Sequence, residues 1–240
     1  MDFNIAVLLV SIIAGAVASV SGFGIGSLLT PLFATQMDTK IAVAAVSIPH
    51  LLGTALRAWV LRKNIDRKVL FSFGISSAIG GLSGAILHNL ILAPALSTVF
   101  GCILIFAGFL GASGIGRRLE FKGWLSWTAG ALSGLLGGLV GNQGGIRSAA
   151  MLAFPLPKES FVATATAIGI VVDLARIPVY LALEHKELGS QSAVLSIASL
   201  GVLCGTVLGM SFLQKLNEAR FKQIVSGFIL ALGIYFLLKH

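Results

Sequence analysis

Very few charged residues lie inside the apolar parts of this 240-residue chain, and they have the clearest capacity for chemistry. Among 17 basic and 9 acidic side chains, those within apolar runs are Arg57, Arg147, Asp173 and Arg176. A charged side chain at the centre of a bilayer costs about 2.5 kcal/mol or more, so each needs a partner or a water-filled cavity. Each is therefore a candidate for a substrate path.

Asp173 and Arg176 are three residues apart, a spacing that predicts pairing on one helix face. Two interpretations of this pair stay open: a structural salt bridge, or a protonatable carboxylate coupled to a cation beside a substrate path. Arg57 lies about one turn before the basic segment 62–68, so we expect it to snorkel toward the interface. Arg176 lies about two turns before its run ends at Leu183, so snorkelling explains it less well.

Arg147 stands in a glycine-rich stretch, GNQGGIRS at 141–148, within an otherwise apolar run. Where a helix starts after such a turn, free backbone N–H groups and the positive end of the helix dipole favour an anion. The first half of the chain has a similar uncharged stretch, SGFGIGS at 21–27. Two such helix starts facing each other would form a site for a small oxyanion. Close helix packing is the alternative explanation for the glycines alone.

These patterns define two sets of candidate residues. Glycines permit close backbone approach to a ligand, and amide side chains offer donors and acceptors. The expected substrate-binding residues are Gly22, Gly24, Gly26, Ser27, Asn142, Gln143, Gly144, Gly145 and Arg147. The expected coupling or path residues are Asp173, Arg176, Arg57, Ser47, His50 and Thr166. Most hydroxyls of this second kind bond to the helix backbone, and a few can line a path.

No catalytic or metal-binding pattern is visible in the sequence. The four histidines are scattered, without H-E-x-x-H or a Cys/His spacing for zinc. There is no P-loop motif for ATP hydrolysis, and the G-x-G-x-G at 22–26 lacks the preceding strand of a dinucleotide fingerprint. We therefore expect no catalytic residue, no metal and no cofactor, and a protein that is not an enzyme.

Composition identifies the class of protein that holds these residues. The chain is 56% hydrophobic and only 11% charged, whereas a soluble domain carries about 25% charged residues. Long apolar runs recur along its whole length, so we expect an integral membrane protein. The net charge of +8 gathers in short clusters between these runs, which orient membrane proteins, so nucleic acid is not an expected partner.

Eight apolar runs can be distinguished, and their ranges are about 5–33, 41–61, 69–93, 95–114, 123–156, 160–183, 191–213 and 223–238. Helical spans are expected because lipid cannot satisfy free backbone groups. The first run, with 29 residues, would make about 44 Å of continuous helix, too long for a hydrocarbon core of roughly 30 Å at an ordinary tilt. Both the first and the fifth run contain glycine clusters, so we expect each to be broken into two helices.

The two broken runs belong to an internal duplication. A shift of 119 residues places Gly15 on Gly134 and Arg57 on Arg176. We expect one transmembrane domain with a first repeat at 1–116 and a second at 117–240. Each repeat would be a re-entrant or hairpin helix broken at glycine, followed by three transmembrane helices.

Loop charges predict that the repeats have opposite orientations. The segment 62–68 holds four basic residues and one acid, and its counterpart, the expected loop 184–187, holds two acids and one Lys. Basic loops lie on the cytoplasmic side. The two segments should therefore lie on opposite sides, which requires inverted repeats and places both termini outside if the broken runs re-enter. Inverted repeats with discontinuous helices are typical of secondary transporters.

The first glycine stretch, GFGIGSLLTPLF (22–33), is followed by the expected helix AVAAVSIPH, and the second, GNQGGIRSAAML (141–152), by VATATAIGI. These stretches and helices resemble the TauE/SafE sulfite exporter family. The resemblance covers essentially the whole chain. It implies a multi-pass permease of the bacterial inner membrane that moves sulfite or related sulfur-containing anions without ATP. The family pattern tends to have three successive glycines and a later Pro in both turns. Here Ile25 interrupts the first set, and the second has only Gly144-Gly145, with Ala150 at the position equivalent to Pro31.

We therefore expect a secondary transporter, an exporter of a small anion such as sulfite or another sulfur-containing or organic anion, bound between the two broken helices. An importer or a permease for another organic acid is the alternative, followed by a membrane enzyme or scaffold that transports nothing. The expected partners are the anionic substrate and the lipid bilayer, and a homodimer stays open. Arg147 has Leu28 as its equivalent in the first repeat, so this asymmetry is where we expect substrate choice.

Overall fold

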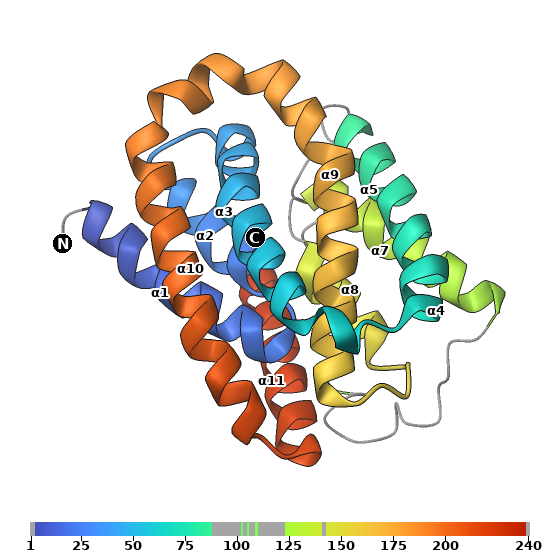
Figure 1. Ribbon diagram of the computed structural model, residues 1–240. Coiled ribbons are helices and arrows are strands. Elements are labelled where there is room, and N and C mark those ends of the chain that lie inside the picture. Colours follow the sequence, from blue (N-terminus) through green and yellow to red (C-terminus); the bar gives the residue numbers. More distant parts are fainter. Residues whose placement is uncertain are drawn as a thin grey trace.

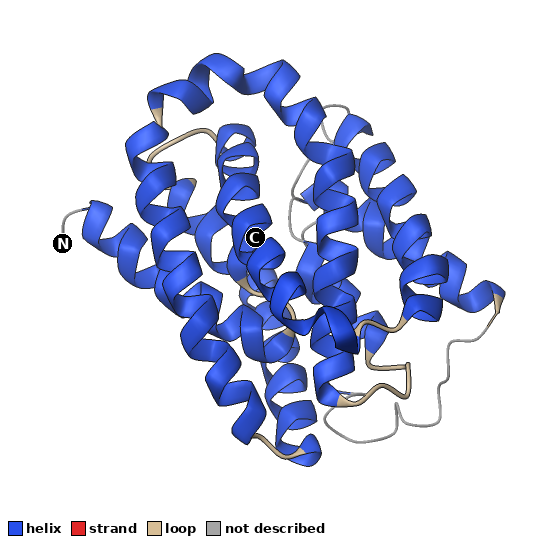
Figure 2. Ribbon diagram, in the orientation of Figure 1, coloured by secondary structure: helices blue, strands red, loops and turns tan. Residues whose placement is uncertain are grey.

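The computed structural model describes residues 3–87, 102, 105, 109, 123–140 and 143–238. Throughout this part the secondary structure is helical, without strands (Figure 2). Five of its helices are long and apolar enough to cross a membrane, at Phe3–Ser21, Ile41–Asn64, Arg67–Leu87, Lys158–Ala182 and Ser192–Lys215. The predicted all-α membrane protein is confirmed. The expected run 95–114 lies almost wholly outside the described residues.

The helices follow one another along the chain as labelled in Figure 1. Their bounds are α1 Phe3–Ser21, α2 Ile25–Phe33, α3 Thr39–Leu61, η1 Arg62–Asn64, α4 Arg67–Val69, the π-helix η2 Leu70–Gly74, α5 Ile75–Leu87, α7 Trp124–Val140, α8 Gln143–Met151, α9 Lys158–Ser190, α10 Ser192–Lys215 and α11 Glu218–Leu238. Two of them, α2 and α8, have nine residues each, about 13 Å of helix, and are too short to cross a bilayer alone.

A glycine turn separates α1 from α2. Gly22 and Gly24 have φ of 82° and 136°, backbone conformations that side chains with a Cβ rarely adopt. The hydroxyl of Ser21 donates to the carbonyls of Val17 (2.9 Å) and Phe23 (2.7 Å), which satisfies acceptors at the end of α1. At the corresponding position in the second half, α7 ends at Val140 and α8 begins at Gln143.

The expected loop at 184–187 is wrong. These residues lie within α9, which runs without interruption from Lys158 to Ser190. Leu, Ala, Glu and Lys are all good helix formers, and no Gly or Pro occurs between Pro178 and Gly189 to end the helix. The charged residues end the apolar run but do not end the helix, which continues to Ser190.

Residues 62–66 and 184–187 lie near opposite ends of α9. The backbone N–H of Asp66 donates to the hydroxyl of Thr164, 2.9 Å away, near the start of α9. Glu184 is 20 residues further along the same helix, about 30 Å of rise. In Figure 1, α4 and the start of α9 lie in the lower half, and α9 leads into α10 at the top.

Two helix pairs pack closely through glycine. A Cβ added to Gly205 on α10 would overlap the carbonyl oxygen of Ile12 on α1, and one added to Gly80 on α5 would overlap the carbonyl oxygen of Ala131 on α7. Such close backbone approach is how small residues join helices in membranes. Ile12 and Ala131 are 119 residues apart, so the two interfaces use residues that the predicted 119-residue shift places on each other.

The reverse contacts show the same equivalence. Gly15 on α1 meets the backbone of Thr206 on α10, and Gly134 on α7 meets the backbone of Gly81 on α5. Gly15 and Gly134 are again 119 residues apart. The first helix of each half thus packs against the third long helix of the other half.

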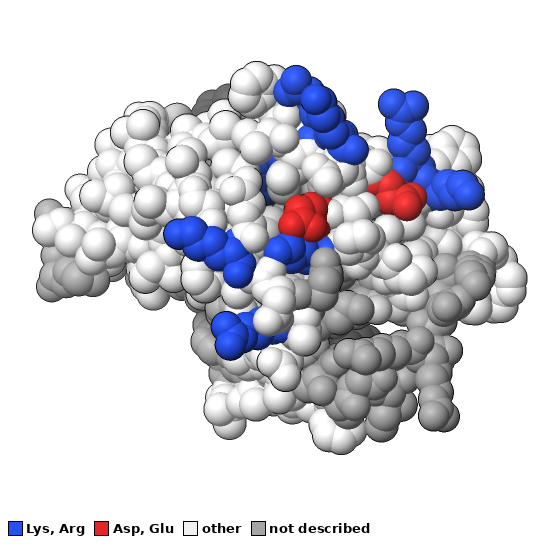
Figure 3. All heavy atoms as spheres, turned by 60° about the horizontal axis from the view of Figure 1, so that its bottom comes forward, with Lys and Arg blue, Asp and Glu red and all other residues white. Residues whose placement is uncertain are grey.

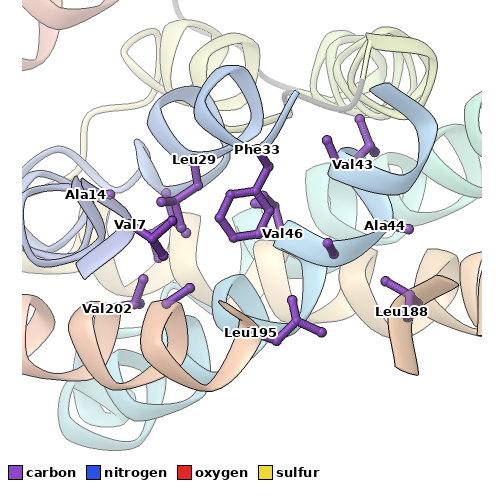
Figure 4. Close-up of a cluster of buried hydrophobic side chains, with 14 of the residues drawn as sticks. Val7, Ala14, Leu29, Phe33, Val43, Ala44, Val46, Leu188, Leu195 and Val202 are labelled. Atoms are coloured by element: carbon purple, nitrogen blue, oxygen red, sulfur yellow. The ribbon is translucent and has the colours of Figure 1, made fainter. Parts of the chain in front are cut away.

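Apolar clusters hold the two short helices in place. Leu29 and Phe33 of α2 are buried with Val7 of α1, Val46 of α3 and Val202 of α10 (Figure 4). A second cluster includes Ile146 and Met151 of α8 together with side chains of η2, α9 and α11. Both short helices are therefore packed inside the bundle, where they can position polar groups away from lipid.

Candidate anion-binding site

The starts of α2 and α8 lie close together inside the bundle. A Cβ on Gly144 would be 2.5 Å from the Cβ of Phe23, and a Cβ on Gly22 would be 3.8 Å from the hydroxyl of Ser148 and 3.2 Å from the Cβ of Ala165. The glycines at both turns thus allow the two short helices and α9 to meet. Gly26 and buried Ser27 lie in the first turn of α2, and buried Gly145 lies in the first turn of α8. Asn142 lies outside the described residues, as does the side chain of Gln143.

Arg147 is completely enclosed, with 1% of its surface exposed. Its guanidinium lies against Gly169 of α9, where a Cβ would be 3.4 Å from both terminal nitrogens. Its Nε and Nη2 have no hydrogen-bond partner among the described residues. A buried guanidinium normally has its donors satisfied, so these two donors lack the partners that burial normally requires among the described residues.

Arg57 is equally buried, and its predicted snorkelling to the interface is wrong. Its Nε donates to the hydroxyl of Thr166 on α9 over 3.1 Å, and it too is 1% exposed. Its Nη1 has no partner in the described part of the chain. Snorkelling fails because α3 turns this position toward α9 in the bundle interior, which position along the sequence could not reveal.

Asp173 lies between two basic side chains. Nε and Nη2 of Arg176 donate to its Oδ1 at 3.0 and 2.9 Å, so the pairing predicted from their spacing is confirmed. Nδ1 of His50, on α3, hydrogen-bonds Oδ2 over 2.5 Å. The guanidinium of Arg176 also lies 5.8 Å from the ring centroid of Tyr180. Both carboxylate oxygens are thus occupied, and the group joins α3 to α9.

The two hydroxyls predicted for the path have different partners. Ser47 donates to the carbonyl of Ala44 over 2.5 Å, while Thr166 accepts from Arg57. Among the predicted path residues the structure therefore unites Arg57 with Thr166, and His50 with Asp173 and Arg176. Ser47 bonds to its own helix, the ordinary behaviour of a helical hydroxyl.

The charges of the site do not balance. Arg147 is attracted by Asp173 and repelled by Arg176, and Arg57 and Arg147 repel each other. Asp173 is the one acidic residue of the sequence inside an apolar run, and it already pairs with Arg176. Arg57 and Arg147 are left without a carboxylate partner among the described residues. An anion of two charges would compensate them.

Sequence reasoning missed Gly169 and Ser148. Gly169 makes room for the Arg147 guanidinium, and it lies 119 residues after His50, so the alignment of the two halves could have identified it. Ser148 is buried beside Arg147, and its hydroxyl has no partner in the part of the chain that is described. It carried no signal of its own, because a lone serine on a helix is ordinary.

A model of the family described as sulfite exporter TauE/SafE matches residues 7–236. Comparison with curated proteins found no match, and neither did comparison with solved structures. Within the described residues there is no group of three or more His, Cys, Asp or Glu side chains that could hold a metal ion.

Proposed function

The chain belongs to the sulfite exporter TauE/SafE family, and from this premise we propose that it is a secondary transporter that exports a small divalent oxyanion such as sulfite. Family membership and the apolar helices make it a multi-pass membrane permease. The inner membrane of a bacterial cell is the proposed location. The substrate lies between α2 and α8, beside α3 and α9.

The observation that carries this proposal is the pair of buried arginines that have no carboxylate partner in the described part of the chain. Burying Arg57 and Arg147 inside a membrane protein is costly unless an opposite charge compensates them. A planar guanidinium binds oxyanions through paired hydrogen bonds, which a spherical ion cannot accept in the same geometry. Gly144 and Gly22 let backbone approach the same region, which supports a compact substrate.

We assign coupling to His50, Asp173 and Arg176. These three side chains connect α3 with α9, the first long helices after the two short ones. A proton moving to or from His50 would change the charge beside the substrate, because Asp173 and Arg147 also interact. This provides a physical route from a proton gradient to anion release.

We further propose two inverted repeats, 1–116 and 117–240, with α2 and α8 as re-entrant helices. The equivalent glycine contacts of α1 with α10 and of α7 with α5 support this arrangement. It is also supported by the separation of residues 62–66 and 184–187 along α9, about one bilayer core in length. Labelling of cysteines introduced at Lys63 and Lys186 should find them on opposite sides of the membrane. Labelling of both from one side would contradict the inversion.

Sulfite flux in proteoliposomes under an imposed pH gradient tests the substrate site. Arg147→Gln should lower the flux roughly 100-fold, since losing one partner of a buried charged contact costs several kcal/mol. Arg220→Gln makes the same charge change at an exposed residue and should transport like the parent. Equal flux for both variants would contradict the assignment of Arg147.

Competition tests the charge of the substrate. Sulfate, a divalent oxyanion, should inhibit sulfite flux, whereas nitrate and chloride at the same concentration should not. Equal inhibition by nitrate and sulfate would rule out the requirement for two charges. Flux of a carboxylic acid in preference to sulfite would instead favour an organic acid permease.

A further inference from the structure

A surface cavity of about 550 Å³ lies between the start of the span Arg67–Leu87 and the start of α7. Its lining residues are Arg67, Lys68, Phe71, Ser72, Gly123 and Trp127. None of them belongs to the anion site. A role for this cavity is therefore sought separately from substrate binding.

Local hydrogen bonds hold the helices around this cavity in place. The carboxylate of Asp66 accepts from the N–H of Val69 over 3.0 Å and caps α4. The hydroxyls of Ser72 and Ser126 are 2.7 Å apart and join η2 to α7. Gly123 has φ of 56°, and a Cβ added there would have no atom of the described residues within 4 Å. The hydrogen bonds of Asp66 and Ser72 thus hold the wall of the cavity in place.

The lining combines two kinds of chemistry. Arg67 and Lys68 supply positive charge, and Phe71 and Trp127 form an edge-to-face pair with centroids 5.8 Å apart. Among the described residues, no acidic side chain lines the cavity. The surrounding end of the molecule, which faces the viewer in Figure 3, carries Lys and Arg side chains with few acidic ones between them.

The position of the cavity matches the membrane interface. A candidate span begins at Arg67, and the exposed Trp124 and Trp127 start α7. Tryptophan is enriched at the level of lipid headgroups, and basic pockets between helices there bind anionic headgroups. A free anion would make no apolar contact with Phe71 and Trp127, whereas the upper part of a lipid tail would pack against both rings.

We propose that this cavity binds the headgroup of an anionic phospholipid. Arg67 and Lys68 contact the phosphate, and the acyl chains leave along Phe71 and Trp127. The lipid would join the span Arg67–Leu87 to α7 and so stabilise the contact between these two helices at this end.

Binding can be measured by native mass spectrometry and by thermal unfolding of the detergent-purified protein during titration with phosphatidylglycerol. We expect bound phosphatidylglycerol and a raised Tm, with little effect from phosphatidylcholine or from glycerol 3-phosphate, the free headgroup analogue. Equal stabilisation by phosphatidylcholine would overturn the charge selectivity. Equal stabilisation by glycerol 3-phosphate would overturn the role of the lipid tail.

A matched pair of double variants locates the site. Arg67→Gln with Lys68→Gln should weaken phosphatidylglycerol binding roughly tenfold or more, since each basic side chain contributes near an anionic lipid. Arg62→Gln with Lys63→Gln removes the same charge from the same segment but does not line the cavity, and should bind like the parent. Equal losses of lipid affinity in both double variants would indicate unspecific electrostatic attraction and overturn the site. Unchanged affinity in both would also overturn it.

Trp127→Leu keeps every charge and serves as the second test if the first double variant fails to fold. It should weaken phosphatidylglycerol binding while leaving the Tm without lipid nearly unchanged, because Trp127 is 40% exposed. Unchanged lipid binding in this variant would contradict the aromatic wall.

Discussion

The two short helices occupy corresponding places in the two halves, but they carry different chemistry. Leu28 of α2 corresponds to Arg147 of α8, and on the following long helices His50 corresponds to Gly169 and Thr54 to Asp173. Around them, the glycine contacts of α1 with α10 and of α7 with α5 are equivalent residue by residue. The backbone packing is thus common to both halves, and so is one arginine, Arg57 or Arg176, whereas Arg147 and Asp173 have no charged counterpart. On the proposed duplication, one repeat keeps the common backbone geometry and also carries the polar groups that would choose a ligand.

The largest difference between the halves should appear at Asp173 and its equivalent, Thr54. Asp173→Ala leaves His50 and Arg176 without their shared acceptor, and removing one partner of a buried ion pair costs about 3–5 kcal/mol. Among the described residues, Thr54 bonds to backbone carbonyls of its own helix alone, so Thr54→Ala should cost less than about 1 kcal/mol. SDS-induced unfolding of both variants measures the two losses of stability. Similar losses would show that the ion pair at Asp173 stabilises its half no more than Thr54 stabilises the other.

The second test moves the charge from one half to the other. Arg147→Leu should lower sulfite flux roughly 100-fold, and adding Leu28→Arg should not restore it. Leu28 is 38% exposed, and its half has His50 where the other half has the open Gly169, so the new guanidinium has no equivalent place. Flux assays on the single and double variants give the answer. Recovery in the double variant would mean that the two sites are interchangeable.

The third test concerns what the halves share. Gly205→Ala and Gly134→Ala should each destabilise the protein by about 1–3 kcal/mol, because the added Cβ meets backbone that cannot move aside. Gly227→Ala is the control, since a Cβ there has no neighbour within 4 Å. In detergent unfolding, the stability of the Gly227→Ala control should equal that of the parent. A large effect in only one of the two interfaces would break their equivalence.

The smallest expected effect is at Gly169. A Cβ there would lie 3.4 Å from the Arg147 nitrogens, an ordinary contact, so Gly169→Ala should change sulfite flux less than about threefold. Gly169→Leu should displace the guanidinium and approach the loss seen for Arg147→Leu. Parent-like flux in the leucine variant would show that Arg147 does not act from this position.

Several features could be predicted because they depend on neighbours along the chain. Asp173 and Arg176 pair as their spacing requires, and the apolar runs are helical. The errors concern side-chain direction and helix length. Arg57 points inward instead of snorkelling, since its direction depends on where α9 lies, and α9 continues through 184–187 because these residues favour helix despite their charge.

The sequence by itself determined the membrane class, the family and the few interior charges, since these follow from composition, motif and local spacing. Only the tertiary structure decided which partners the interior charges find beyond their own helix. His50 reaches Asp173, and Arg57 reaches Thr166, from a helix more than 100 residues away in the chain. The physical reason is that an ion pair depends on distance in space, and the packing of α3 against α9 sets that distance. The surplus of two arginines, and with it the proposed charge of the substrate, emerges from that packing.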